Sequence, residues 1–122
     1  MRCVLLLNNA EPKPGEVSPE AIAAMQEAFG TYGRELEAAG VLVAAEVLTA
    51  PAEGTSLTRR TWAVDARHGP FAPATEPLMG VFILDVPDRA TALAWAEKCP
   101  GATYGIVEVR TSATSFVDGQ WT

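Results

Sequence analysis

The order of the apolar segments along the chain constrains its fold more than any other feature. Five of these segments predict strands, at residues 4–7, 41–48, 57–64, 81–86 and 104–110. The first is a continuous apolar run, which favours a strand buried on both faces, whereas the third is polar enough to be more exposed. Helices are expected at residues 18–39 and 88–99. This order favours an α+β, ferredoxin-like βαββαβ fold with an extra strand, in which both helices lie on one face of an antiparallel sheet.

The first expected helix has clear signals at both ends. Ser18 suits the N-cap, Pro19 suits the first helical position, and Gly40 suits a left-handed residue after the last turn. Apolar residues recur at spacings of three and four and therefore share one face: Ile22, Met25, Phe29, Tyr32 and Leu36. Gly30 and Gly33 interrupt this helix. They indicate either close packing against a neighbour, which we favour, or room for a ligand.

The second expected helix can begin with Asp88 as its N-cap and ends before Pro100. Its alanine content leaves open which side faces the sheet. The two alternatives are the face with Leu93, Ala96 and Cys99 and the face with Ala92, Trp95 and Cys99.

One layer of helices covers only one face of such a sheet. The chain has 122 residues and offers no further helix for the other face. A second copy of the chain is the natural cover, because a two-fold pair buries the same surface on both partners. We therefore expect a homodimer in which the two sheets face each other.

Charge and cysteine content exclude several classes of protein. Fifteen acidic against nine basic residues give a net charge of −6, which disfavours binding to nucleic acid or to an anionic membrane. The N-terminal apolar run is too short for a spanning helix and lacks a signal-peptide pattern. Cys3 and Cys99 lie in apolar segments and are expected in the core, and a single histidine excludes a His-rich zinc site. We expect a soluble, cytoplasmic protein without metal or cofactor.

Residues 58–76 hold most of the polar side chains of chemical interest. His68 is the only histidine and therefore the candidate for proton transfer near neutral pH, oriented by Asp65 or Glu76. The alternative is that His68 anchors its loop and that both carboxylates are solvated. Arg59 and Arg60 are adjacent on an expected strand and therefore point to opposite faces. One of them can hold an anionic group. The alternative is that both are solvated on an edge strand, which they protect from aggregation.

Larger side chains are candidates for lining an apolar binding site. The aromatic candidates are Trp62, Phe71, Phe82 and Tyr104. An aromatic residue in a strand more often packs in a core or an interface, which is the alternative for all four. Tyr32 lies on the apolar face of the first helix, where core packing is again the alternative. Glu35 lies beside that face and points either inward, toward the end of the sheet, or outward to water.

The segment His68-Gly69-Pro70-Phe71-Ala72 resembles the Asp-Gly-Pro-Phe-Ala signature of the DGPF branch of the YCII-related family. Further segments similar to the family pattern follow in order: Val4–Leu7, Tyr32–Gly33, Glu35–Leu36, Ala39–Leu42, Glu76, Leu78, Gly80, Asp85–Val86, Ala92–Ala96, Cys99–Pro100 and Val107–Arg110. The resemblance covers residues 2–110. We therefore expect a YCII-related domain at 1–110 and a polar tail at 111–122.

The resemblance implies a dimeric α+β barrel, whose subunits pack sheet to sheet around a cavity. Relatives of this barrel include lyases, isomerases and monooxygenases, some YCII-like proteins are thought to use a His–Asp pair, and DGPF proteins are associated with extracytoplasmic-function sigma factors. This sequence lacks that pair, because the first helix holds no histidine and Cys99 stands before Pro100 in place of aspartate. The chemistry of that pair is therefore not carried over. His68 also replaces the aspartate of the signature, and the two alternatives are that it creates a new base or that it marks a member without the original role.

Two functions follow from these observations. In the first, the protein binds a small, mostly apolar organic molecule, and as an enzyme it would use His68 for cofactor-independent acid/base chemistry of the lyase, isomerase or cyclase type. In the second, it is a non-catalytic regulatory or protein-interaction module. The first is our leading hypothesis, and the missing His–Asp pair and the few polar candidates motivate the second.

Overall fold

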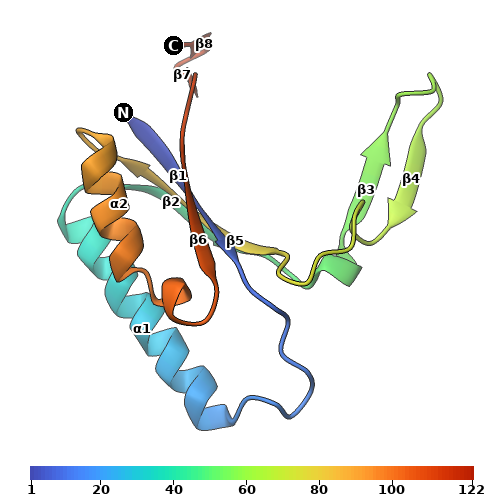
Figure 1. Cartoon of the computed structure of the whole chain (residues 1–122). Coiled ribbons are helices and arrows are strands. Elements are labelled where there is room, and N and C mark those ends of the chain that lie inside the picture. Colours follow the sequence, from blue (N-terminus) through green and yellow to red (C-terminus); the bar gives the residue numbers. More distant parts are fainter.

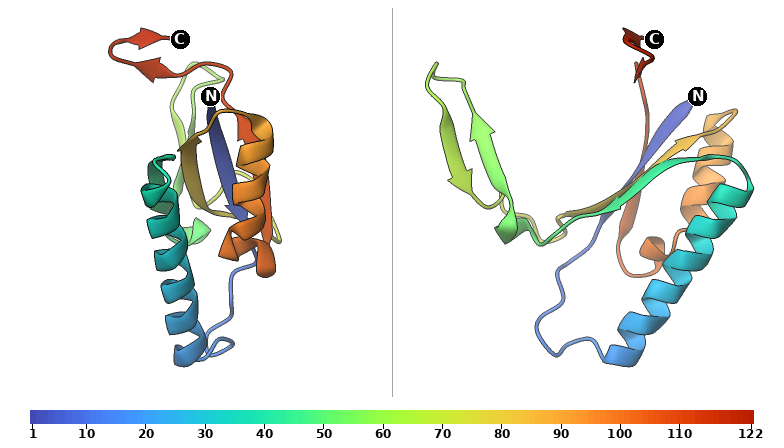
Figure 2. Two further views of the ribbon diagram at one scale, coloured as in Figure 1. Left: turned by 90° about the vertical axis from the view of Figure 1, so that its left-hand side faces the viewer. Right: turned by 180° about the vertical axis from the view of Figure 1, so that it is seen from behind.

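A four-stranded antiparallel sheet and two helices form the body of the molecule (Figure 1). The computed structural model describes residues 1–122. The sheet has the strand order β2-β5-β1-β6, formed by Leu42–Val47 (β2), Leu78–Asp85 (β5), Arg2–Asn8 (β1) and Ile106–Thr111 (β6). Helices α1 (Pro19–Ala38) and α2 (Arg89–Lys98) lie on the same face of this sheet (Figure 2). This arrangement confirms the expected α+β, ferredoxin-like fold.

Strand β1 lies in the middle of the sheet and buries alternate side chains. Cys3, Leu5 and Leu7 are buried beneath the helices, whereas Val4 and Leu6 are only partly buried. The prediction that this run is buried on both faces is therefore wrong for a single copy. The reason is that the helices cover one face of the sheet and leave the other open.

One apolar core lies between the sheet and the helices. Its buried members are Cys3, Leu5, Leu7, Tyr32, Leu36, Phe82, Leu84, Val86, Ala92, Ala96 and Cys99. Both cysteines are free and buried, which confirms their expected place in the core.

Helix α1 begins and ends as the sequence predicts. The Ser18 hydroxyl accepts a hydrogen bond from the amide of Ala21, and Gly40 follows the helix with φ 72°. Of the apolar face, Tyr32 and Leu36 are buried, but Ile22 remains 47% exposed. The N-terminal half of α1 extends beyond the end of the sheet (Figure 2), so its apolar side chains have no strand to pack against.

Helix α2 begins at the expected cap, Asp88. The Asp88 carboxylate accepts hydrogen bonds from the hydroxyl and the amide of Thr91, and these bonds lower the pKa of Asp88. Ala92, Ala96 and Cys99 are buried and Trp95 is partly buried, whereas Leu93 is 44% exposed. The face with Ala92, Trp95 and Cys99 thus packs on the sheet and includes Ala96 of the other alternative, but not Leu93.

A hairpin projects from the body on the side of the sheet opposite the helices (Figure 2). It consists of β3 (Thr55–Thr58) and β4 (Asp65–His68), which pair antiparallel, and we call residues 55–68 the arm. No helix or strand of the body packs extensively against the arm. Its base is held by a hydrogen bond from the amide of Gly69 to the carbonyl of Gly54.

The arm corrects the predicted strand at 57–64. The chain turns between Thr58 and Asp65, with a hydrogen bond from the Trp62 amide to the Arg59 carbonyl and with φ 70° at Trp62. Arg59 and Arg60 therefore lie in a turn and not on opposite faces of a strand. His68 lies at the end of β4, paired with Thr55, and not in the loop that follows.

The remaining elements are short. Two 3₁₀ helices lie at Pro51–Glu53 and Pro100–Thr103, and the segment after β6 carries a hairpin of β7 (Phe116–Val117) and β8 (Gln120–Trp121). The rings of Phe116 and Trp121 meet edge to face at 5.4 Å in that hairpin. No helix is both long enough and apolar enough to cross a bilayer.

Candidate functional site

A pocket of about 610 Å³ opens between α1 and the end of the sheet at which β1 and β2 end. We call it the α1 pocket. Its helical wall consists of Met25, Phe29, Gly30 and Gly33, and its strand wall consists of Leu42, Ala45, Met79, Gly80 and Phe82. The volume lies within the range of about 300–1,000 Å³ that is usual for small-molecule sites.

The two glycines of α1 leave the helical wall of the pocket open. A Cβ atom at Gly33 would meet no atom within 4 Å, and one at Gly30 would meet only the end of the Arg34 side chain, at 3.2 Å. The favoured explanation, close packing against a neighbour, is therefore wrong for Gly33. The alternative, room for a ligand, fits the position of both residues in the wall of the pocket.

Replacing Gly33 with alanine is expected to raise the free energy of unfolding by about 0.5–1 kcal/mol, because alanine favours the helix and its Cβ fits the open space. Gly80→Ala is the matched opposite case, since its Cβ would lie 3.1 Å from the carbonyl oxygen of Glu46 and force β2 away. Urea denaturation measures both. A loss of stability in Gly33→Ala would contradict the open wall.

Aromatic packing makes the inner end of the pocket rigid. The rings of Phe29 and Phe82 are stacked with centroids 6.3 Å apart, and Tyr32 meets Phe82 edge to face at 5.3 Å. This chain of rings runs from the pocket into the core. The pocket therefore offers a preformed apolar surface to a ligand.

A few polar groups border this apolar surface. Asn9, Gln26 and Tyr104 contribute to the lining, and so does Glu46, whose pairing with Val81 places its side chain on the sheet face away from the helices. Burial and the nearby Cys99 raise the pKa of Tyr104, so its hydroxyl stays protonated at neutral pH and can donate a hydrogen bond. Asn9, Gln26 and Tyr104 can orient a ligand, but they include no histidine and no carboxylate for acid/base chemistry.

Of the residues predicted to bind substrate, Tyr104 and Phe82 do line the pocket. Tyr32 lies behind it in the core, where its hydroxyl donates a hydrogen bond to the carbonyl of Trp95 at 2.8 Å. Glu35 is exposed, which agrees with the outward alternative.

The other predicted residues lie on the arm or in the loop that follows it. They are Arg59, Arg60, Trp62, Asp65, His68, Phe71 and Glu76. His68 and Glu76 are exposed, and no hydrogen bond joins His68 to either carboxylate in a single copy. The structure thus separates them from the α1 pocket, and a catalytic role for His68, Asp65 and Glu76 stays a prediction.

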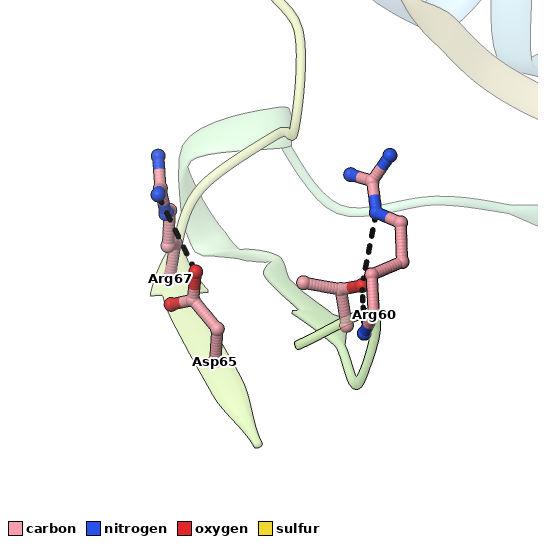
Figure 3. A network of polar contacts seen from close by, with 4 residues as sticks. Arg60, Asp65 and Arg67 are labelled. Carbon is pink, nitrogen blue, oxygen red and sulfur yellow. Dashed lines mark hydrogen bonds and ion pairs between the residues drawn. The ribbon is translucent and has the colours of Figure 1, made fainter. Parts of the chain in front are cut away.

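Polar contacts on the arm are local (Figure 3). Asp65 accepts a hydrogen bond from Arg67 at 3.3 Å, and Nε of Arg60 donates to the hydroxyl of Thr58 at 3.3 Å. Both arginines remain largely available, because each uses only part of its guanidinium group in these contacts.

Sequence reasoning missed most of the pocket. Met25, Ala45 and Met79 are ordinary apolar residues whose convergence depends on how α1 crosses the sheet. The one local signal was the pair Gly30 and Gly33, since glycine is costly inside a helix and indicates a special need for space.

A second hollow, of about 460 Å³, lies on the arm and brings together Arg60, Asp65 and Phe71. Neither a reactive cysteine nor a metal cluster occurs beside these two pockets. Burial raises the pKa of the Cys99 thiol, which keeps this sulfur protonated and unreactive. No three side chains of His, Cys, Asp or Glu lie close enough together to hold a metal ion.

Comparison with known proteins identifies the family of this chain through a family model. A search of the curated proteins found no match to this sequence. The family model of the YCII-related domain matches residues 1–113, which is nearly the whole chain and includes every strand of the central sheet. The chain therefore belongs to the YCII-related domain family.

Proposed function

We propose that this protein binds a small, mostly apolar organic molecule in the α1 pocket. The observation that carries the proposal is the open space at Gly30 and Gly33 beside the rigid pair of rings formed by Phe29 and Phe82. The few polar groups at its border, including the protonated Tyr104 hydroxyl, favour a ligand with one or two hydrogen-bonding atoms on an apolar frame.

Two finer proposals differ in whether the bound molecule reacts. A cofactor-independent lyase, isomerase or cyclase would need His68, with Asp65 or Glu76 and an arginine, to reach a bound ligand from the arm. A non-catalytic regulatory role as a member of the DGPF branch needs only the binding site. The sparse polar lining of the pocket favours binding without catalysis.

The homodimer remains part of the proposal. The face of the sheet opposite the helices carries an apolar centre of Val4, Leu6, Val81 and Ile83. Val4 faces Ile83, and Leu6 faces Val81, across the two central strands. A second copy would cover this open face and bury both pairs.

Substitution of two adjacent alanines on β2 tests pocket binding and pairing of the sheets separately. Ala45 faces Phe82 and lines the α1 pocket, whereas Ala44 faces Ile83 on the open face. The probe is the fluorescent dye 1-anilinonaphthalene-8-sulfonate, titrated into the intact protein. Ala45→Trp fills the pocket and is expected to weaken dye binding by about tenfold or more, which corresponds to about 1.4 kcal/mol.

The control for this experiment is Ala44→Trp, which leaves the pocket unchanged. We expect it to keep dye affinity within about threefold, a difference of under 1 kcal/mol. Equal affinity in the wild type and Ala45→Trp would show that the dye binds elsewhere and would contradict the proposed site.

A further inference from the structure

The arm exposes large apolar side chains that nothing in its own chain covers. Trp62 is 96% exposed and Phe71, just after the arm, is 92% exposed, while Leu57 and Val64 are each more than half exposed. A two-stranded hairpin by itself is marginally stable in water. The arm therefore has both the reason and the surface to pack against another molecule.

The charge of the arm indicates which molecule this is. Arg59, Arg60 and Arg67 stand against Asp65, so the arm carries +2, and the rest of the chain must carry −8 to give the net charge of −6. A basic arm on an acidic body is complementary to a second copy of the same chain. Two bodies alone would repel each other, and two arms would reduce this repulsion.

The position of the arm keeps it from covering the open face of its own sheet. The arm stands on the same side as the open face of the sheet but apart from it (Figure 1). The open face combines the apolar residues Val4, Leu6, Val81 and Ile83 with charged residues of both signs. These are Arg2 on β1, Glu46 on β2, Asp85 on β5, and Glu108 and Arg110 on β6, the last two forming an ion pair at 3.8 Å. An apolar, basic projection and an open apolar face on an acidic body thus occur once each per chain, as a two-fold interface requires.

We propose that the arm is an intermolecular clasp. In a pair of chains, each arm packs on the body of the other copy, with Trp62 at the tip as the apolar anchor and with its arginines facing carboxylates of the partner's acidic body. Left-handed backbone at Trp62 closes the tight turn that presents this ring. The clasp rests on the proposed homodimer and adds to it a second contact, outside the paired sheets.

The experiment is sedimentation velocity of the full chain over a series of concentrations. Trp62→Ser is expected to raise the dissociation constant of the dimer at least tenfold, since an exposed tryptophan at an interface commonly acts as an anchor. Arg60→Glu is expected to raise it as well, with an effect that shrinks as salt is added. Trp121→Ser, an exposed tryptophan on the other hairpin, is the matched control and should leave the constant within about twofold.

The outcomes distinguish failure of the clasp from failure of the proposed homodimer and of binding in the α1 pocket. If Ala44→Trp weakens the dimer while Trp62→Ser and Arg60→Glu do not, the sheets pair without the arm and the clasp is wrong. If the wild-type chain is a monomer at every concentration, both the homodimer and the clasp are wrong, although dye binding in the α1 pocket can still hold. Circular dichroism of each variant confirms that a weaker dimer does not reflect unfolding of the body.

Discussion

Tyr32→Ala is expected to lower the free energy of unfolding by about 3–5 kcal/mol, the usual cost of removing a buried aromatic side chain. Tyr32 is 2% exposed and its ring meets Phe82 at 5.3 Å and Trp95 at 6.3 Å. Its hydroxyl also joins α1 to α2 through the carbonyl of Trp95. Urea denaturation at neutral pH measures the loss, and a change below about 1 kcal/mol would contradict the core position of this ring.

Tyr32→Phe is the control that keeps the ring and removes the hydroxyl. The expected loss is about 1 kcal/mol, the usual net value of one hydrogen bond. This variant also tests a pH effect. Burial, with smaller effects from Cys99 and Glu35, raises the pKa of Tyr32 well above its ordinary value of 10.0.

The direction of this pH effect follows from proton linkage. A raised pKa in the folded protein means that folding favours the protonated phenol. The contribution of Tyr32 to stability is then complete below pH 10.0 and is lost as the pH rises above that value. Wild-type protein should therefore lose stability more steeply above this pH than Tyr32→Phe. Parallel losses in the two proteins would contradict the burial of the phenol.

Leu5→Ala is expected to cost about 2–5 kcal/mol of unfolding free energy, because it leaves a cavity at the centre of the core. Leu5 is fully buried on the middle strand and faces Phe82 and Val109 on the neighbouring strands. Urea denaturation measures this loss, which should be the same at low and high protein concentration. A loss below about 1 kcal/mol would contradict the central position of Leu5.

Leu6→Ala is the matched control on the same strand and the opposite face. Leu6 is partly buried in one copy, so its truncation should cost less than that of Leu5 when the protein is dilute. If a second copy covers the open face, the cost should grow with protein concentration, because dimerisation stabilises the folded chain by mass action. A cost that does not depend on concentration would count against pairing through this face.

Local signals explain why the helices are well predicted. Ser18, Asp88 and Gly40 act through hydrogen bonds and backbone angles within a few residues of themselves, so the sequence contains all the information they need. The strand at 57–64 is wrong for the complementary reason. Its residues suit a strand individually, but the turn at Trp62 requires a left-handed backbone that the side chain itself does not indicate.

The candidate site shows the limit of reasoning from residue type. His68, Asp65 and Glu76 attract attention because their chemistry is versatile, but the fold places them away from the apolar pocket. Of the residues predicted to bind substrate, only Tyr104 and Phe82 line this pocket. The pocket is made mainly of unremarkable apolar residues, whose role depends on where α1 extends beyond the sheet.

By itself, the sequence determined the family resemblance, the order of the two helices and the four strands of the central sheet, and the single layer of helices, because periodicity and capping depend on neighbours along the chain. Only the tertiary structure decided that Gly33 faces open space, that Tyr32 lies in the core, and that residues 55–68 leave the body as an arm. These properties depend on which segments approach one another in space. A glycine, an aromatic ring or a hairpin acquires its role from the atoms that surround it or from their absence.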